Sequence, residues 1–183
     1  MQKTDLALYN NHSYHPGGGA VKRMLWHYTN LVIFKSGLLP VYGFKILVLK
    51  AFGAKIGRNI TIKPHVNIKY PWNLAIGDNA WIGENVWLDS LVMITIGPNA
   101  CVSQGAMLLT GSHNYKTTTF NLITGPVTLE EGVWIGAGAT VNQGITAGSH
   151  AVLTSGSVAT KNLDAYSVYQ GNPAVKVRPR TIE

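Results

Sequence analysis

The side chains best suited to chemistry in this chain are six histidines and one cysteine. An imidazole has an ordinary pKa near ~6.5, so it can take a proton from a hydroxyl group at neutral pH. One histidine, His113, lies in the polar and turn-rich segment TGSHNYKTTTFNLITGP, residues 110–126. His113 is therefore the candidate general base, and the alternative is a histidine on an ordinary surface loop. The others, in a polar terminus, an expected helix or regular repeats, are His12, His15, His27, His65 and His150.

A metal site and a cysteine nucleophile are both disfavoured. No pair of histidines has the spacing of converging metal ligands, so we expect no metal. The single Cys101 excludes an internal disulfide and a multi-cysteine zinc site. It precedes an apolar position at a turn with no histidine nearby, so we interpret it as structural. A lone thiol fits a reducing, cytoplasmic location, and the polar segment 1–11 resembles no signal peptide.

A six-residue repeat must form the frame that positions His113. Six residues make one short strand and one corner, so three such sides close a coil of about 18 residues. Coils stack at roughly 4.8 Å, and we expect glycines after the lead residues to ease the turns. The sequence therefore predicts an all-β fold, a parallel β-helix. Its inward-facing lead residues are Ile56, Ile62, Ile68, Ile76, Ile82, Leu88, Ile96, Val102, Leu108, Leu129, Ile135, Val141, Ala147, Leu153 and Ala159.

The repeat also sets the expected organisation of the chain. It fails between Leu108 and Leu129, so residues 110–126 are predicted to form a loop extruded from the coils, where function is often found. Residues 55–183 form the β-helix domain, with a tail at 164–183 that caps its open end. Residues 1–54 form a short N-terminal helical segment packed on the first coil.

The N-terminal segment combines helical apolar spacing with positive charge. The net charge is +7, and residues 1–70 hold ten Lys or Arg and one acid, Asp5. In the simplest interpretation, the basic side chains form a solvated helix face. The more specific alternative is peripheral contact with an anionic membrane surface. Nucleic acid is not expected, because no recognition motif accompanies the charge. The helical pattern is carried by Val21, Met24, Leu25, Tyr28, Leu31 and Val32, then by Phe44, Leu47, Val48 and Ala51.

The chain resembles the hexapeptide-repeat O-acetyltransferases from about Tyr14 to Arg180. The motifs are TGSHNY, PVTLEEGVWIGAGATVNQGI, SVATKNL and GNPAVKVR, similar to maltose and galactoside acetyltransferases. The stretch KYPWNLAIGDNAWIGENVWLD is similar to acetyltransferases assigned to colanic acid biosynthesis. The resemblance implies a left-handed β-helix, a homotrimer with active sites between subunits, acetyl-CoA along the groove between two β-helices, and His113 as the base.

The resemblance also implies binding residues for each substrate. A second arginine of the family falls on Val175, which leaves phosphate binding more to Lys161, Arg178 and Arg180. A sugar-contacting aspartate of the family falls on Leu91, and Asp89 is its proposed substitute. The expected coenzyme A contacts are Trp134, Ala137, Ser155, Thr160, Lys161 and Arg178, and the expected acceptor contacts are Asn85, Asp89 and Tyr115.

The function expected from these features is direct acetyl transfer from acetyl-CoA to a sugar hydroxyl, in exopolysaccharide or cell-surface glycan biosynthesis. Backbone N–H groups near Ala137 would stabilise the tetrahedral intermediate. Two alternatives stay open. One is an N-acyltransferase acting on an amino sugar or an amino acid, built on a scaffold like that of serine acetyltransferase, and the other is a non-catalytic β-helix scaffold.

Overall fold

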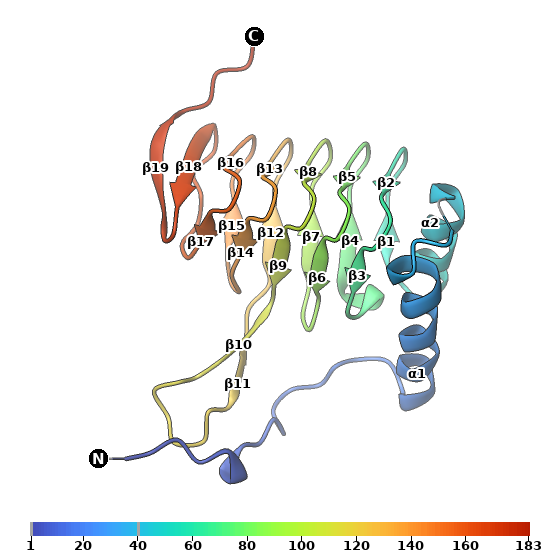
Figure 1. Cartoon of the computed structure of the whole chain (residues 1–183), viewed down its shortest axis with the longest axis vertical. Coiled ribbons are helices and arrows are strands. Elements are labelled where there is room, and N and C mark those ends of the chain that lie inside the picture. Colours follow the sequence, from blue (N-terminus) through green and yellow to red (C-terminus); the bar gives the residue numbers. More distant parts are fainter. Residues whose placement is uncertain (1, 40) are drawn as a thin grey trace.

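The computed structural model describes residues 2–39 and 41–183, and within them the chain winds into a three-sided parallel β-helix (Figure 1). The first side holds β1 (Lys55–Ile56), β4 (Leu74–Ile76), β7 (Ile94–Ile96), β12 (Val127–Leu129) and β15 (Thr146–Ala147). The second holds β2 (Thr61–Ile62), β5 (Trp81–Ile82), β8 (Cys101–Val102), β13 (Trp134–Ile135), β16 (Val152–Leu153), β18 (Ser167–Gly171) and β19 (Ala174–Pro179). The third holds β3 (Asn67–Ile68), β6 (Trp87–Asp89), β9 (Met107–Leu109), β14 (Thr140–Val141) and β17 (Val158–Ala159).

The predicted lead residues form the core of this β-helix. Every one of them is buried, and they pair coil upon coil in parallel register. On the second side, Ile62 pairs with Ile82, Ile82 with Val102, and Val102 with Ile135. Each coil therefore buries its interior against its neighbours, as the six-residue repeat predicts.

The glycines that follow the lead residues have a different role from the one expected. Their backbones do not adopt the left-handed conformation, so they do not serve to ease a turn. Instead the next coil passes too close for a side chain. A Cβ on Gly77 would lie 2.5 Å from the backbone N of Pro98, and one on Gly83 would lie 2.5 Å from the backbone N of Gln104. These positions require glycine because two backbones meet there.

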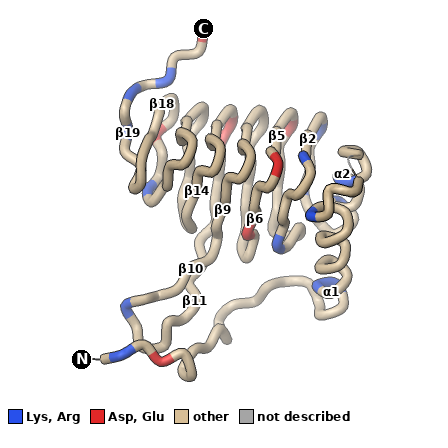
Figure 2. Tube along the Cα trace, viewed as in Figure 1, with Lys and Arg blue, Asp and Glu red and all other residues tan. Residues whose placement is uncertain are grey.

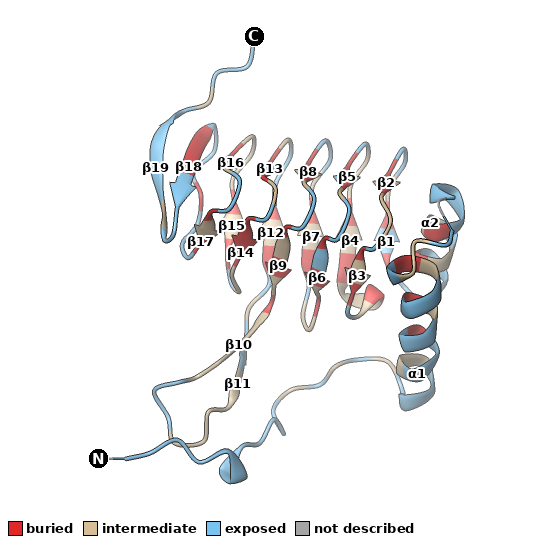
Figure 3. Ribbon diagram, viewed as in Figure 1, coloured by how far each residue is buried: buried red, intermediate tan, exposed pale blue. Residues whose placement is uncertain are grey.

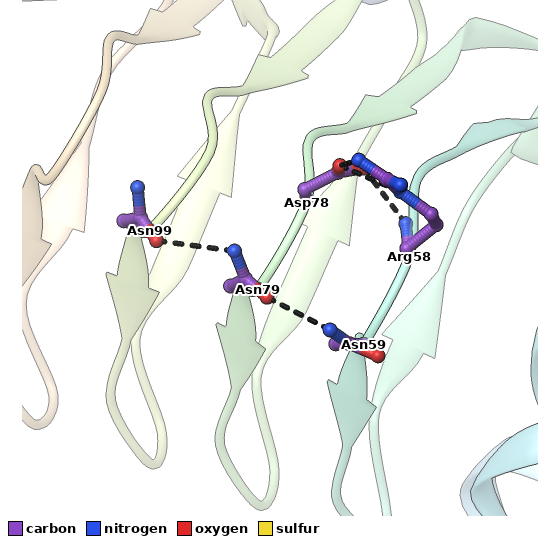
Figure 4. A network of polar contacts seen from close by, with 5 residues as sticks. All are labelled: Arg58, Asn59, Asp78, Asn79 and Asn99. Atoms are coloured by element: carbon purple, nitrogen blue, oxygen red, sulfur yellow. Dashed lines mark hydrogen bonds and ion pairs between the residues drawn. The ribbon is translucent and has the colours of Figure 1, made fainter.

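Asparagine occupies the left-handed corner between the first and second sides in the first three coils. Between the first and second sides, Asn59, Asn79 and Asn99 have φ of 55°, 59° and 56°. Their side chains form a ladder (Figure 4), in which the amide of Asn59 donates to Asn79 at 3.1 Å and that of Asn79 donates to Asn99 at 3.4 Å. Asparagine tolerates this conformation and adds hydrogen bonds along the stack.

Two helices cover the open end of the first coil. They are α1 (Ala20–Thr29), continued by the π-helical turn η2 (Asn30–Lys35), and α2 (Tyr42–Ala51). Their buried side chains satisfy polar groups of the exposed strand edges. Trp26 Nε1 donates to the carbonyl of Ile68 at 2.9 Å, and Lys45 Nζ donates to the carbonyls of Ile62 and Lys63 at 3.4 and 3.3 Å. Burial lowers the pKa of Lys45.

The face of the helices that meets the coil is not the one that the apolar spacing suggests. Trp26, Asn30 and Phe34 are buried, whereas the apolar series that begins at Val21 points outward. No helix within the described ranges 2–39 and 41–183 is both long and apolar enough to cross a bilayer.

The C-terminal tail is more regular than the expected capping loop. Leu163 is buried and pairs with Ala147 at the start of a further coil. Strands β18 and β19 then form an antiparallel hairpin that extends the second side. A salt bridge of 3.1 Å between Lys176 and Asp164 joins the hairpin to the preceding loop.

Candidate active site

His113 lies at the root of an arm that leaves the β-helix at one corner, residues 110–126, here called the His113 arm (Figure 1). The arm begins after β9 on the third side and returns to β12 on the first side, so it interrupts one corner. Strands β10 (Gly111–His113) and β11 (Leu122–Thr124) pair antiparallel and place His113 opposite Leu122. The predicted extruded loop is therefore a hairpin whose base is fixed to the coils.

The imidazole of His113 is held in one orientation. Its Nδ1 lies 2.9 Å from the carbonyl oxygen of Phe120. A carbonyl oxygen only accepts, so Nδ1 carries the hydrogen and the neutral ring presents its free electron pair at Nε2. The Phe120 ring stacks on the imidazole, with centroids 4.5 Å apart and planes 4° from parallel. The geometry suits a proton acceptor that acts through Nε2.

Phe120 itself has a left-handed backbone, with φ of 49°. This conformation is strained for a bulky residue, and such strain is concentrated at functional sites. In this conformation the carbonyl of Phe120 accepts the hydrogen bond from His113, and the Phe120 ring stacks on the imidazole. Phe120 is a site residue that sequence reasoning missed, because the apolar repeat that marks other positions is absent from the arm.

The N-terminal segment also reaches the arm. The ring of Tyr9 lies 5.7 Å from that of His113, the backbone N–H of Asp5 donates to the carbonyl of Thr118 at 2.9 Å, and that of Asn10 donates to the Asn121 side chain at 3.2 Å. The expected N-terminal segment 1–54 thus has two parts. Its helices pack on the first coil, while the residues around Tyr9 form one wall beside His113.

The three expected acceptor contacts lie at different places. Asp89 ends β6, pairs with Leu109 and accepts a backbone hydrogen bond of 3.3 Å from Thr110, so it lies at the base of the His113 arm. It is half-buried, and burial raises its pKa while Lys69 opposes the shift. Tyr115 is in the arm with 76% of its surface exposed. Asn85 occupies a left-handed corner between the second and third sides, away from the arm.

Four of the expected donor contacts lie on or beside the second side. Trp134 is half-exposed there, and its Nε1 donates to the hydroxyl of Ser103 at 2.9 Å. Ser103 lines a groove together with Trp81 and Cys101. Ala137 and Ser155 follow β13 and β16 at adjacent corners, and Arg178 lies in β19. Among the described residues, no group accepts a hydrogen bond from the backbone N–H of Ala137.

The two remaining expected coenzyme A contacts are exposed, whereas the side chain of Arg180 is hydrogen-bonded within the chain. Thr160 and Lys161 follow β17 and are exposed at the same corner of the β-helix as the arm, two coils further along. The guanidinium of Arg180 donates to the carbonyls of Gly132 and His150 at 3.0 and 3.1 Å, so it holds the tail against the coils.

The geometry separates His113 from most of the donor contacts within one chain. The His113 arm leaves the corner between the third and first sides, and the second side, with Trp134, lies opposite that corner of the triangle. A ligand lying against Trp134 therefore does not lie against His113 of the same chain. In the described ranges no three His, Cys, Asp or Glu side chains gather as a metal site would require.

Comparison with known proteins identifies the family. The model for the hexapeptide repeat of succinyl-transferase matches residues 126–161. WcaF of Escherichia coli (strain K12), an acetyltransferase assigned to colanic acid biosynthesis by its name, is 40% identical over 164 residues, which cover 90% of each chain. This chain belongs to the hexapeptide-repeat acetyltransferases. It is therefore an acyltransferase.

Solved structures agree with this family. A hexapeptide-repeat acetyltransferase of Vibrio cholerae superposes with a TM-score of 0.81 at 23% identity, covering 88% of this chain and 92% of the other. Galactoside acetyltransferase in complex with coenzyme A superposes with a TM-score of 0.78 at 25% identity, covering 88% and 82%. The hexapeptide-repeat acetyltransferase shares the left-handed β-helix, so the expected fold is confirmed.

Proposed function

We propose that this hexapeptide-repeat acetyltransferase moves an acetyl group from acetyl-CoA to a sugar hydroxyl in the synthesis of a cell-surface polysaccharide. The observation that carries the proposal is the hydrogen bond between His113 Nδ1 and the Phe120 carbonyl, which leaves Nε2 free to act as the base. The similarity to WcaF supports a polysaccharide acceptor, and the coenzyme A bound to galactoside acetyltransferase supports the donor.

The proposed reaction needs no covalent enzyme intermediate. The acceptor hydroxyl gives its proton to His113 Nε2 as its oxygen attacks the thioester carbonyl. The tetrahedral oxyanion is stabilised by backbone donors, for which the uncommitted N–H of Ala137 is the candidate. The carbon–sulfur bond then breaks, and the coenzyme A thiolate takes the proton from the imidazolium. The products are an acetyl ester and free thiol.

The proposed active site is shared between subunits of a homotrimer. His113 and Trp134 lie on opposite parts of one β-helix, so a second copy would bring its Trp134 face against the arm. Trp81, Trp87 and Trp134 are 58%, 39% and 46% exposed on the sides of the β-helix, where a neighbouring copy would cover them. The roles of Ser155, Thr160, Lys161 and Arg178 toward coenzyme A, and of Asp89, Asn85 and Tyr115 toward the acceptor, are part of this proposal. So is a cytoplasmic location, which the free thiol of Cys101 suits.

The first experiment is an acceptor panel. Sugars, nucleotide sugars and amino sugars are incubated with acetyl-CoA, and thiol release and product mass are measured. We expect acetylation of a hydroxyl, and a loss of about 10²–10⁴-fold in kcat for His113→Ala with folding unchanged. Transfer to an amine alone would support the N-acyltransferase alternative. Near-normal turnover by His113→Ala would exclude His113 as the base.

The second experiment tests the shared site. Inactive His113→Ala and Trp134→Ala chains are mixed, unfolded and refolded together. If each site takes His113 from one chain and Trp134 from another, some mixed sites hold both native residues and activity returns. The matched control mixes His113→Ala with His113→Asn chains, which cannot restore a site. Equal activity in both mixtures would contradict a site between subunits.

A further inference from the structure

The N-terminal helices carry an apolar face that no residue in the described ranges covers. Across α1 and η2 the inner face is buried against the first coil, whereas the outer side is exposed (Figure 3). The outer side chains recur at helical spacing, and each has 47–67% of its surface exposed. They are Val21, Met24, Leu25, Tyr28, Leu31 and Val32.

Exposed apolar side chains continue in the segment before α2 and in α2 itself. Leu38, Val41, Phe44 and Leu47 are 75%, 58%, 44% and 67% exposed, respectively. Together with the series on α1 and η2 they form what we call the outer apolar face. So many exposed apolar side chains on neighbouring helices are uncommon on a soluble monomer, and they indicate contact with a partner or a membrane.

The charge around this face has one sign. From Leu6 to Gly77 the chain has no Asp or Glu, and cations lie on and beside the helices (Figure 2). Lys35 and Lys50 are exposed, whereas Lys45 is internal and unavailable to a partner. We propose that the outer apolar face docks on an anionic phospholipid surface, with its apolar side chains at the acyl boundary and the lysines at the headgroups.

Charge favours lipid over a second copy of this chain as the occupant. A symmetric contact through the outer apolar face would bring the same cations from both copies together, with no acid between residues 6 and 77 to pair with them. An anionic bilayer supplies the opposite charge. The helices also lie at one end of the β-helix, so docking leaves its sides free. In the cyclic trimer of the proposed function, three such faces point to the same end and bind together.

Vesicle flotation tests the proposal without any measurement of activity. The purified chain is mixed with vesicles of phosphatidylcholine alone or of phosphatidylcholine with phosphatidylglycerol. We expect binding to the anionic vesicles only, and weaker binding as salt is raised. Leu25→Ser and Leu47→Ser are each expected to lower the partition about tenfold. The matched control is Val175→Ser, since Val175 is 60% exposed at the opposite end of the β-helix.

The charge is tested in the same assay. Lys35→Gln and Lys50→Gln should each weaken binding to anionic vesicles by about fivefold, and Lys116→Gln in the His113 arm should not. Failure of the unmodified chain to float with phosphatidylglycerol overturns the proposal, as does equal loss in the control variants. Light scattering tests the alternative that a second copy of this chain binds the outer apolar face. If Leu47→Ser lowers the particle mass in solution, the outer apolar face is a protein interface, and the proposal is wrong.

Discussion

The regular coils and the His113 arm follow opposite rules of construction. In the coils each inward position repeats, and residues such as Ile82 and Val102 have essentially no exposed surface. Within the arm only the first residue, Thr110, is buried, and no residue from Gly111 to Pro126 is. The coils gain stability from close backbone packing, and the arm gains its conformation from a few local contacts around His113. The stability of the coils and the orientation of the candidate base therefore depend on separate segments, and variants should separate them.

The sharpest test of the coils is Gly77→Ala. The added methyl would lie 2.5 Å from the backbone of Pro98, so neighbouring coils must move apart. We expect a loss of about 1–3 kcal/mol in the free energy of unfolding, measured by denaturant titration. Gly43→Ala is the control, because a methyl group added at Gly43 would meet no atom within 4 Å and alanine favours the helix. Equal effects in the two variants would refute the role of close approach.

The complementary test of the arm is Phe120→Ala. It removes the ring that stacks on His113 at 4.5 Å but no buried core residue. We expect kcat to fall about tenfold while the melting temperature changes little, because the imidazole is less well oriented. Phe120→Tyr keeps the ring and should retain most of the activity. A large drop in melting temperature would instead make the arm part of the stabilising frame.

A smaller effect is expected at the asparagine corners. Asn79→Ala places a less tolerant residue at φ of 59° and breaks two links of the ladder. The expected loss is about 1 kcal/mol in the free energy of unfolding. Asn79→Gly keeps the backbone preference and loses only the exposed hydrogen bonds. If both variants are equally destabilised, the ladder rather than the backbone conformation determines the residue at this corner.

The smallest effect is expected at Asp89, where the coils meet the arm. Burial raises the pKa of its carboxyl in the folded protein, so the ionised form costs stability above that pKa. The cost disappears as the pH falls through the raised pKa and the group is protonated. Asp89→Asn should therefore be more stable than the native chain at neutral pH, by under about 1 kcal/mol for a half-buried group, and equally stable in acid. Thermal melts of both proteins from acid to neutral pH test this. If the stability difference between Asp89→Asn and the native chain did not change with pH, the ionised Asp89 carboxylate would not be its cause.

The sequence predicted the coils well because their signal is local. The six-residue period predicts the burial of each lead residue, such as Ile82, and the failure of that period located the His113 arm. The buried face of the helices was harder to predict, because it depends on the polar groups of the strand edge that the helices cover. Asn30 is buried there since its side chain bonds Asn67 and the backbone of Ile68, which an apolar pattern cannot reveal.

The surroundings of His113 were also beyond the sequence. Tyr9 lies beside His113 although more than a hundred residues separate them, and neither belongs to a repeat. The pairing of Phe120 with His113 depends on a backbone conformation that no residue preference predicts for phenylalanine. The candidate base could be predicted, whereas its orientation could not.

The buried Lys45 has a consequence for how these molecules behave in concentrated solution. A β-helix ends in open strand edges, which could accept the end of another β-helix and grow into a fibre. Lys45 occupies two carbonyls at such an edge, and α2 lies over it. A strand of another molecule therefore cannot pair with these carbonyls unless it displaces the Lys45 ammonium group. We therefore expect this cap to prevent end-to-end polymerisation of the β-helix.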